Sequence, residues 1–450
     1  MPVRAWEPGG FPALTTDLYQ LTMTQAYYAE GLTGEAVFDL FVRRLPPSRN
    51  YLVACGLESI LDLLENVRFE SGDLEYLSGL GRFTPEFVAK LADFRFEGDV
   101  YAMPEGTVFF SNEPVIEVVA PLPQAQLVET YLLNQLTFQS AVASKCARVV
   151  EAAGDRQVVD FGLRRVHGAE AGISAARAFY VAGASGTSNV MAGRLFGIPV
   201  AGTMAHSYIT AHGDELAAFR AFTERNAETV LLVDTYDTLE GVKNVVRLAR
   251  ELGCDFNVSA IRLDSGDIGE LAKRSRAILD EAGLSGVAIF ASGGLDEHEI
   301  DSLLRNGAPI DGFGVGTKMG VSADAPYLDT VYKLAAYEGE GRMKLSTDKE
   351  TLPYRKQVFR EYDGGTLKSD TIGLHDERLP GRPLLKQVME QGRHTDAGRD
   401  HLEAARRRAN SQIEALPEYL RGLAPAGRPY EVSVSERLAA ETEALRLSLE

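Results

Sequence analysis

The stretches VVDFGLRRVHG (158–168), SGTSNVMAGRLFG (185–197) and IPVAGTMAHSY (198–208) lie close together in the chain. Short apolar runs at Val158–Val159, Phe179–Val181 and Pro199–Ala201 each end in small or polar residues, and the last run leads to His206. Short apolar runs of this kind are typical of buried strands. We interpret them as strands whose carboxyl ends carry the chemistry.

Four further runs continue this pattern. They end near Asp234, Asp264, Ser292 and Gly316, in TVLLVDTYD (229–237), FNVSAIRLDSGD (256–267), VAIFASGGLD (287–296) and DGFGVGTKMG (311–320). Most gaps are roughly 20 to 30 residues, the length of one βα unit, and they contain helical patterns such as residues 238–253 and 268–283. With residues 330–337 as an eighth strand, the pattern predicts an α/β fold with an irregular, closed (β/α) barrel. In such a barrel the active site lies at the carboxyl ends of the strands.

The βα rhythm divides the chain into three predicted domains. Residues 1–130 lack the rhythm and predict an N-terminal α+β domain. Residues 131–335 form the barrel, which is entered through a long helix. Residues 336–450 form a C-terminal segment whose first part we expect to pack on the N-terminal domain. In this segment, residues 342–360 are strand-like, residues 395–423 predict a charged amphipathic helix, and the residues from Glu431 predict a surface helix.

The composition excludes several classes of protein. The chain has 450 residues and a net charge of −18, so we expect no nucleic-acid partner. An anionic substrate therefore needs local arginines and lysines. The cysteines Cys55, Cys146 and Cys254 are too widely spaced for a disulfide framework or a CxxC zinc site. No run reaches the roughly 18 apolar residues of a membrane span, so we expect a cytoplasmic protein with no membrane partner.

His206 is a candidate catalytic residue because it lies just beyond a predicted strand end. A histidine there can act as an acid, a base or a nucleophile towards phosphoryl groups. Small neighbours in GTMAHSY permit close approach of a bulky anion. The alternative is a loop histidine held by backbone hydrogen bonds.

Phe161 and the adjacent arginines Arg164 and Arg165 form a second candidate site. The aromatic ring can stack on a planar ligand, while a guanidinium holds a carboxylate or phosphate by its fork geometry. An ordinary strand with exposed arginines is equally compatible with this motif alone.

The later strand ends supply polar and glycine-rich turns. Arg262 and Asp264 alternate along a strand, so Asp264 could hold ribose hydroxyls or Mg²⁺, or only form a structural salt bridge. The pairs Gly293-Gly294 and Gly316-Thr317 resemble backbone cradles for phosphate at helix starts. Two further carboxylates, Asp234 and Asp237, are candidates for metal binding or hydrogen bonding.

A specific family resemblance rests on motifs that recur in order from about residue 15 to residue 360. These are TDLYQLTM (16–23), FDLFVRRLP (38–46), DFGLRR (160–165), GTSNV (186–190), LFGIPVAGTMAHS (195–207), RLDSGD (262–267), SGGLD (292–296), GVGT (314–317), KLS (344–346) and TLPYRKQVFR (351–360). Together they resemble the nicotinate phosphoribosyltransferase family.

The resemblance implies synthesis of nicotinate mononucleotide from nicotinate and 5-phosphoribosyl 1-pyrophosphate (PRPP) in NAD salvage, with Mg²⁺ as cofactor. It also implies that ATP hydrolysis is coupled through a phosphohistidine, at the position of His206. Nicotinate would lie between Phe161 and a tyrosine of the other subunit, matching Tyr19, which implies a homodimer with a shared active site. The positions of Arg164, Arg262 and Asp264 contact the base and ribose in this family, and those of Gly293, Gly294, Gly316 and Thr317 bind phosphate.

Three alternatives remain. Nicotinamide phosphoribosyltransferases have an aspartate at the position of Ser188, where a carboxylate would repel nicotinate, so Ser188 favours nicotinate. Quinolinate phosphoribosyltransferases share the fold class but need additional cationic groups. A catalytically silent barrel that senses metabolites or serves as a scaffold would lack substrate-dependent ATP hydrolysis.

Overall fold

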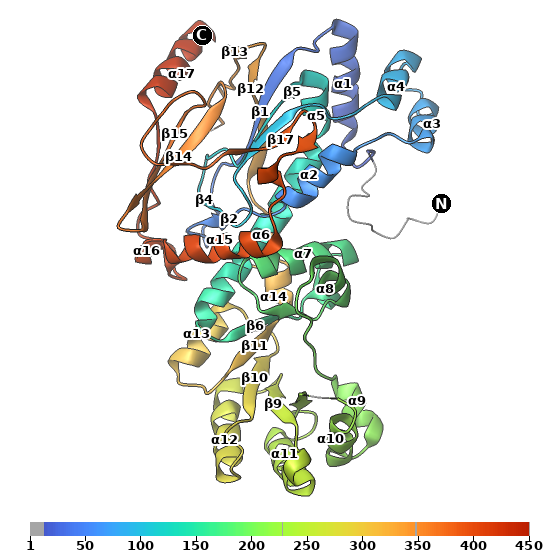
Figure 1. Cartoon of the computed structure of the whole chain (residues 1–450), viewed down its shortest axis with the longest axis vertical. Helices are drawn as coiled ribbons and strands as arrows, with labels where there is room; N and C mark the ends of the chain where they lie inside the picture. The colour runs from blue at the N-terminus through green and yellow to red at the C-terminus, as the bar shows by residue number, and fades with distance from the viewer. Residues whose placement is uncertain (1–12, 227, 347–348, 450) are drawn as a thin grey trace. The chain divides into compact units, whose positions relative to one another are not determined.

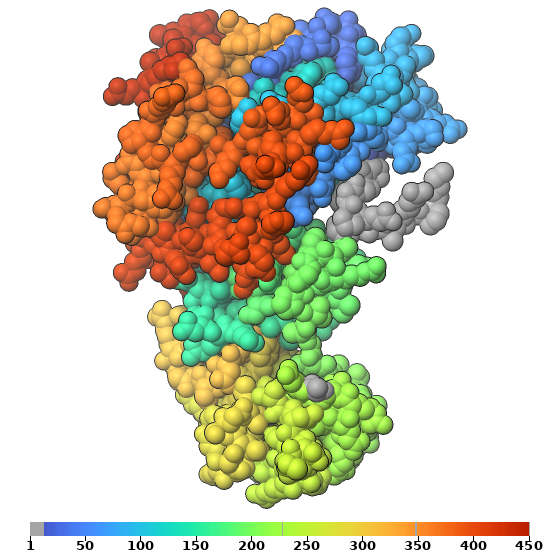
Figure 2. Space-filling model, viewed as in Figure 1, coloured from blue at the N-terminus to red at the C-terminus, as the bar shows by residue number. Residues whose placement is uncertain are grey.

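The computed structural model describes residues 13–226, 228–346 and 349–449, which form two compact units. Unit 2 contains residues 145–324, and unit 1 contains the described residues up to 144 and from 325 onward. The residue range of the predicted barrel domain, 131–335, includes all of unit 2. Figure 2 shows the blue N-terminal and the orange and red C-terminal residues of unit 1 packed in one body. Among the described helices, none has both the length and the apolar character that crossing a membrane requires.

Unit 2 is built on a six-stranded sheet in which every neighbouring pair is parallel. Its strands are β6 (Gln157–Asp160), β7 (Gly186–Thr187), β8 (Thr229–Leu232), β9 (Val258–Leu263), β10 (Ala288–Ser292) and β11 (Gly312–Val315). Their spatial order is β7-β6-β11-β10-β9-β8, and Figure 1 shows β6, β11, β10 and β9 in this sequence. The core strands are short and almost wholly buried, as the apolar runs of the sequence indicate.

Helices follow most strands of unit 2, as the βα rhythm predicts. They are α7 (Ala169–Val181), α8 (Val190–Phe196), α9 (His206–His212), α10 (Glu215–Thr223), α11 (Thr238–Leu252), α12 (Ile268–Glu281), α13 (Glu297–Arg305) and α14 (Thr317–Gly320), with 3₁₀ turns η1 (Leu163–Arg165) and η2 (Gly253–Asp255). Aspartate side chains cap the N-termini of several helices. Asp237 accepts the N–H of Glu240 at the start of α11, and Asp267 accepts the N–H of Glu270 at the start of α12. Asp237 is therefore a helix cap.

The prediction of a closed eight-stranded barrel is wrong in four respects. The sheet is open between β7 and β8 in the described residues, extended only by an isolated bridge between Thr187 and Val200. The run Pro199–Ala201 forms no full strand, consistent with the missing N–H of proline. Residues Phe179–Val181 end helix α7, because they continue the helical spacing of the buried residues before them. Residues 330–337 form β12, which pairs antiparallel with β1 in unit 1. The α/β class and the parallel, barrel-like sheet are confirmed.

Unit 1 contains a seven-stranded antiparallel sheet in the order β13-β12-β1-β5-β3-β17-β18, a four-stranded sheet in the order β16-β14-β15-β19 and a two-stranded sheet of β2 and β4. Its strands are β1 (Glu35–Val42), β2 (Leu52–Val53), β3 (Asp99–Ala102), β4 (Val108–Phe109), β5 (Ile116–Pro121), β12 (Thr330–Tyr337), β13 (Glu340–Gly341), β14 (Lys356–Asp363), β15 (Thr366–Leu374), β16 (Arg382–Pro383), β17 (Lys386–Glu390), β18 (Arg393–His394) and β19 (Val432–Val434). Its helices are α1 (Leu18–Glu30), α2 (Leu57–Asn66), α3 (Ser71–Gly79), α4 (Pro85–Ala92), α5 (Leu122–Leu127), the first part of α6 (Glu129–Ala153), η3 (Asp396–Gly398), α15 (Leu402–Glu414), α16 (Glu418–Arg421) and α17 (Glu436–Leu449).

A buried arginine connects the second sheet of unit 1 to its neighbours. Arg360 in β14 donates from Nε and Nη2 to both carboxylate oxygens of Asp370 in β15, and from Nη1 to the carbonyl of Val108 and the side chain of Gln412. The side chains of Arg360 and Asp370 are fully buried. Because every charge here has a partner, the cluster avoids the penalty of an isolated buried ion.

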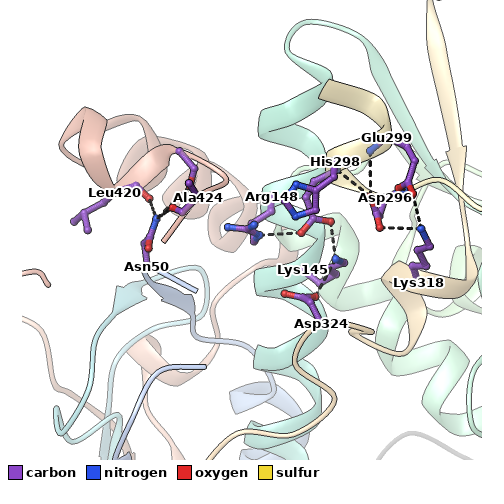
Figure 3. Close-up of polar contacts among 12 residues, drawn as sticks. Asn50, Lys145, Arg148, Asp296, His298, Glu299, Lys318, Asp324, Leu420 and Ala424 are labelled. Atoms are coloured by element: carbon purple, nitrogen blue, oxygen red, sulfur yellow. Dashed lines mark hydrogen bonds and ion pairs between the residues drawn. The ribbon is translucent and has the colours of Figure 1, made fainter. Parts of the chain in front are cut away.

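A second buried ion network joins two helices of unit 2 (Figure 3). Lys145 in α6 contacts Glu297 of α13 through Nζ and Oε2 at 2.5 Å, and Asp324 at 2.9 Å, while Arg148 Nε donates to Glu297 Oε1 at 3.0 Å. Burial alone would raise the pKa of Glu297, but hydrogen bonds and charge from Lys145 and the bond from Arg148 lower it. Glu297 is therefore ionised and joins α6 to α13.

We predict that Lys145→Met lowers the free energy of unfolding by about 3 to 5 kcal/mol, because it leaves two carboxylates without their shared ammonium partner. Urea denaturation followed by circular dichroism measures the loss. The ionised Glu297 stabilises the fold at neutral pH, and this stabilisation is lost as the pH falls through the lowered pKa of Glu297. The difference in unfolding free energy between wild type and Lys145→Met should therefore shrink in acid.

Lys243→Met is the matched control. Lys243 pairs with Glu240 on an exposed face of α11, so its removal should cost less than about 1 kcal/mol. Equal losses for the two variants would show that burial of the Lys145 network contributes nothing.

Candidate functional site

The carboxyl ends of the parallel strands gather the predicted residues of unit 2. They are Phe161 after β6, Ser188 after β7, Arg262 in β9 and Asp264 after it, Gly293 and Gly294 after β10, and Gly316 and Thr317 after β11. Because neighbouring strands are parallel, these ends share one edge of the sheet, where ligands bind in such folds. We call this edge the strand-end site.

Arg262 connects the strand-end site to the loop that precedes His206. Its Nη1 donates to Thr203 Oγ1, and its Nη2 donates to the carbonyl of Met204 at 3.2 Å. The Nε atom is buried and has no hydrogen-bond partner among the described residues. One side of the guanidinium therefore holds the histidine loop, while Nε can serve a bound anion.

The charges that act on Arg262 show that Arg164, another predicted residue, is near the strand-end site. Burial lowers the pKa of Arg262, the charges of Asp264 and Asp234 oppose this shift, and the charge of Arg164 adds to it. Arg164 lies in the exposed turn η1, close enough for its charge to act on Arg262. Two cations and two carboxylates thus share this edge.

His206 is the first residue of α9 and is half-buried. Its Nδ1 lies 3.1 Å from Oγ1 of Thr235, which follows β8. The described residues make no hydrogen bond to Nε2, so this nitrogen can react or transfer a proton. Sequence analysis missed Thr235, although its place directly after Asp234 at a strand end is a usable signal.

Asp234 and Asp264 are two carboxylates at this edge, and each is held by neighbouring donors. Asp234 Oδ2 accepts the backbone N–H of Asp264 at 3.0 Å and the hydroxyl of Ser265 at 2.6 Å. Asp264 Oδ1 accepts the hydroxyl of Ser292. Asp234 Oδ1 is buried and, within the described parts of the chain, has no hydrogen-bond partner.

This donor set fits Mg²⁺ bound together with a phosphate substrate. Magnesium is usually held by one or two carboxylates plus substrate oxygens and water, and Asp234 offers an Oδ1 that is unpartnered among the described residues, while its Oδ2 accepts the backbone N–H of Asp264. The described residues contain no cluster of three or more His, Cys, Asp or Glu side chains that could enclose a metal alone.

Two glycines allow the strand ends to approach one another. Gly293 has φ +92°, and a Cβ there would lie 2.0 Å from the carbonyl oxygen of Asp264. A Cβ on Gly316 would lie 2.8 Å from the carbonyl oxygen of Phe161. Only residues without side chains permit these contacts.

Lys318 joins the two glycine turns. Its Nζ donates to Asp296 at 2.9 Å and to Glu299 at 2.8 Å, as Figure 3 shows. Asp296 also accepts the N–H groups of His298 and Glu299, so it caps α13 itself. The predicted cradle at this helix start is therefore limited to the Gly293-Gly294 turn, because the first turn of α13 is already satisfied.

Asp160 shapes the start of the Phe161 segment. Its carboxylate accepts the N–H of Gly162 and the hydroxyl of Thr187, both at 2.7 Å, and its carbonyl accepts the N–H of Ser188 at 2.8 Å. Burial raises the pKa of Asp160, and these side-chain bonds oppose the shift. Asp160 was not predicted as a site residue, but an aspartate two residues before glycine is a recognisable turn signal.

Two aromatic residues complete the predicted set. The ring of Phe161 is half-buried, with its centroid 6.2 Å from that of Phe290. Tyr19 is in α1 of unit 1 and is 48% exposed, whereas the other predicted site residues belong to unit 2.

Comparison with known proteins gives consistent matches. Residues 14–137 match the nicotinate phosphoribosyltransferase N-terminal domain, and residues 156–349 match the nicotinate phosphoribosyltransferase family. The nicotinate phosphoribosyltransferase pncB2 of Mycobacterium tuberculosis is 54% identical, covering 96% of this chain and 94% of that protein. The Bacillus subtilis nicotinate phosphoribosyltransferase is 44% identical over 83% of this chain and 78% of its own length.

Solved structures also resemble the chain. Human nicotinic acid phosphoribosyltransferase aligns with a TM-score of 0.85 and 29% identity, covering 96% of this chain and 99% of that one. A nicotinate-nucleotide pyrophosphorylase from Pyrococcus furiosus aligns with a TM-score of 0.72 and 28% identity, covering 90% and 95%.

We predict that Gly293→Ala destabilises the chain by at least about 2 kcal/mol, because Ala is strained at positive φ and its Cβ would overlap the backbone of Asp264. Thermal and urea unfolding measure this effect. Gly294→Ala is the adjacent control: φ is +69° but the space is open, so about 1 kcal/mol is expected. A loss at Gly293 no larger than that at Gly294 would contradict the close strand approach.

Proposed function

The chain belongs to the nicotinate phosphoribosyltransferase family, and from this premise we propose that it transfers the phosphoribosyl group of PRPP to nicotinate in NAD salvage, driven by ATP hydrolysis. Nicotinate, PRPP, ATP and water would give nicotinate mononucleotide, pyrophosphate, ADP and phosphate. The observation that carries the proposal is Arg262, which lies at the strand-end site and also holds the loop before His206.

Substrate positioning follows from the groups at the strand ends. The guanidinium groups of Arg164 and Arg262 suit the carboxylate of nicotinate, and the ring of Phe161 suits its pyridine face. Asp264, held by Ser292, can accept hydrogen bonds from the ribose hydroxyls. Loss of pyrophosphate develops positive charge at C1 of the ribose, so catalysis depends mainly on alignment and on stabilising the leaving anion.

Mg²⁺ would be held by Asp234, with Asp264 beside it, and would neutralise charge on the pyrophosphate when bound. The turns at Gly293-Gly294 and Gly316-Thr317 would bring backbone N–H groups to the phosphate oxygens. Lys318 supports this arrangement by keeping the two turns together.

ATP coupling would use His206 as the phosphoryl acceptor. Thr235 occupies Nδ1, which leaves Nε2 to attack the γ-phosphorus of ATP and release ADP; water then takes the phosphoryl group from the histidine. Because Arg262 bonds to Thr203 and Met204, occupation of the nicotinate subsite and the position of the histidine loop are mechanically connected.

A homodimer would complete the site. Phe161 offers one ring for stacking, and the exposed Tyr19 would supply the second from the partner. The alternatives are a nicotinamide-specific enzyme or a non-catalytic sensor, and the absence of a carboxylate at Ser188 argues against the first.

We predict that His206→Ala abolishes nicotinate-dependent release of phosphate from ATP, because the phosphoryl acceptor is missing. PRPP-dependent formation of nicotinate mononucleotide should persist at a reduced rate that no longer responds to ATP. Separate assays of ADP and pyrophosphate with nicotinate, nicotinamide and quinolinate measure both effects.

His212→Ala is the control from the other end of α9, where the side chain is exposed. It should retain ATP stimulation. ATP stimulation that survives in His206→Ala would refute the phosphohistidine, whereas silence of wild type with all three bases would favour a sensor.

We also predict that Ser188→Asp raises KM for nicotinate at least about tenfold, because a carboxylate beside the substrate carboxylate adds roughly 1 to 2 kcal/mol of repulsion. Use of nicotinamide should improve. Ser188→Ala, which adds no charge, should change KM less, and equal effects of Asp and Ala would show that Ser188 does not select the base.

A further inference from the structure

A pocket of about 550 Å³ in unit 1 is lined by arginines from two separate segments. Arg43, Arg44 and Arg49 come from the segment after β1, and Arg428 comes from the loop before β19. The other lining residues are Leu45, Pro46, Pro47, Asn50, Phe110, Ser111, Asn112, Leu420, Pro425, Ala426, Pro429, Tyr430 and Val432. We call this the arginine-lined pocket.

The arginine-lined pocket is electrostatically unusual for this chain. The whole chain carries a net charge of −18, yet the described residues that line the pocket include four arginines and no aspartate or glutamate. Neither Arg44 nor Arg428 forms an ion pair with any described residue; Arg428 lies over the ring of Tyr419 at 4.7 Å. Arg43 has only a long contact of 3.9 Å with Asp329. Arg44 and Arg428 therefore offer positive charge that no described carboxylate neutralises.

Asn50 lines this pocket, and its contacts with Leu420 and Ala424 are drawn in Figure 3. Its buried side chain donates from Nδ2 to the carbonyls of Leu420 and Ala424 at 3.2 and 3.1 Å, and to that of Gly422 at 3.2 Å. Its Oδ1 accepts the N–H of Ala426 at 2.8 Å. The single amide thus fixes the loop that carries Pro425 and leads to Arg428.

The apolar part of the lining is rigid. Four prolines, Pro46, Pro47, Pro425 and Pro429, contribute to the walls, and the ring of proline fixes φ. A pocket that is already formed costs little ordering entropy on binding. Its volume falls within the range of about 300 to 1,000 Å³ that holds organic ligands, so it is larger than a single inorganic ion requires.

From these observations we propose that the arginine-lined pocket binds an organic phosphate of nucleotide size with at least two negative charges. Several guanidinium forks match phosphate oxygens in geometry and exceed what one carboxylate needs. The apolar walls would cover the organic part. None of the pocket residues belongs to the strand-end site, so the proposal holds whether or not the proposed function is correct.

The test is calorimetric titration of the full-length protein with ADP, without Mg²⁺, comparing wild type with Arg44→Ser/Arg428→Ser. Loss of the two arginines should weaken pocket binding at least about tenfold, since each guanidinium would donate charge-assisted hydrogen bonds to the phosphate. The control Arg82→Ser/Arg382→Ser removes the same charge from exposed positions in unit 1 and should leave the affinity within about twofold.

His206→Ala distinguishes the two sites. The arginine-dependent binding of ADP should persist in this variant, and circular dichroism should show that all variants are folded. Retention of wild-type affinity in Arg44→Ser/Arg428→Ser would overturn the proposal, as would loss of all ADP binding in His206→Ala alone. Citrate that binds as tightly as ADP would overturn the assignment to a phosphate, and inorganic phosphate that does so would overturn the role of the organic part.

Discussion

The strand-end site depends on close backbone contact between neighbouring strand ends. A Cβ at Gly293 would collide with the carbonyl of Asp264, and one at Gly316 would press on the carbonyl of Phe161. These contacts fix how the turns after β10 and β11 lie against the ends of β9 and β6. Arg262, Asp264 and Ser292 inherit their positions from that packing, because all three are within a few residues of Asp264 or Gly293.

Charge at this edge is arranged around Arg262. Its burial is unfavourable, as its lowered pKa indicates, and Asp264 and Asp234 compensate only in part. A buried cation with one unpartnered nitrogen gains a hydrogen bond when an anion arrives. The same side chain holds Thr203 and Met204, so a change at the anion would be felt at the start of α9. This gives a physical route by which a binding event and the histidine could be coupled.

Much of the site could be predicted from the sequence because its residues lie at strand ends, and short apolar runs mark those ends well. The runs before Asp234, Asp264 and Ser292 correspond to β8, β9 and β10. Local sequence patterns gave wrong predictions where they do not determine which segments of the chain pack or pair with one another. Phe179–Val181 is apolar enough for a strand but completes the buried face of α7, and residues 330–337 are a strand whose pairing with β1 depends on segments nearly 300 residues apart. Thr235 was missed because its role depends on the loop that brings His206 to it.

The two sites differ in how they hold positive charge, and the difference bears on what each can bind. At the strand ends, the charges of Arg262 and Arg164 are offset by those of Asp264 and Asp234, and the Mg²⁺ and phosphate that we propose for this edge would together add little net charge. In the arginine-lined pocket no lining residue among those described is acidic. The charges of Arg44 and Arg428, which pair with no described carboxylate, are left for the ligand to meet. An acidic protein repels anions in general, so the positive charge of Arg44 and Arg428 suits a ligand whose own negative charge is large enough to overcome that repulsion.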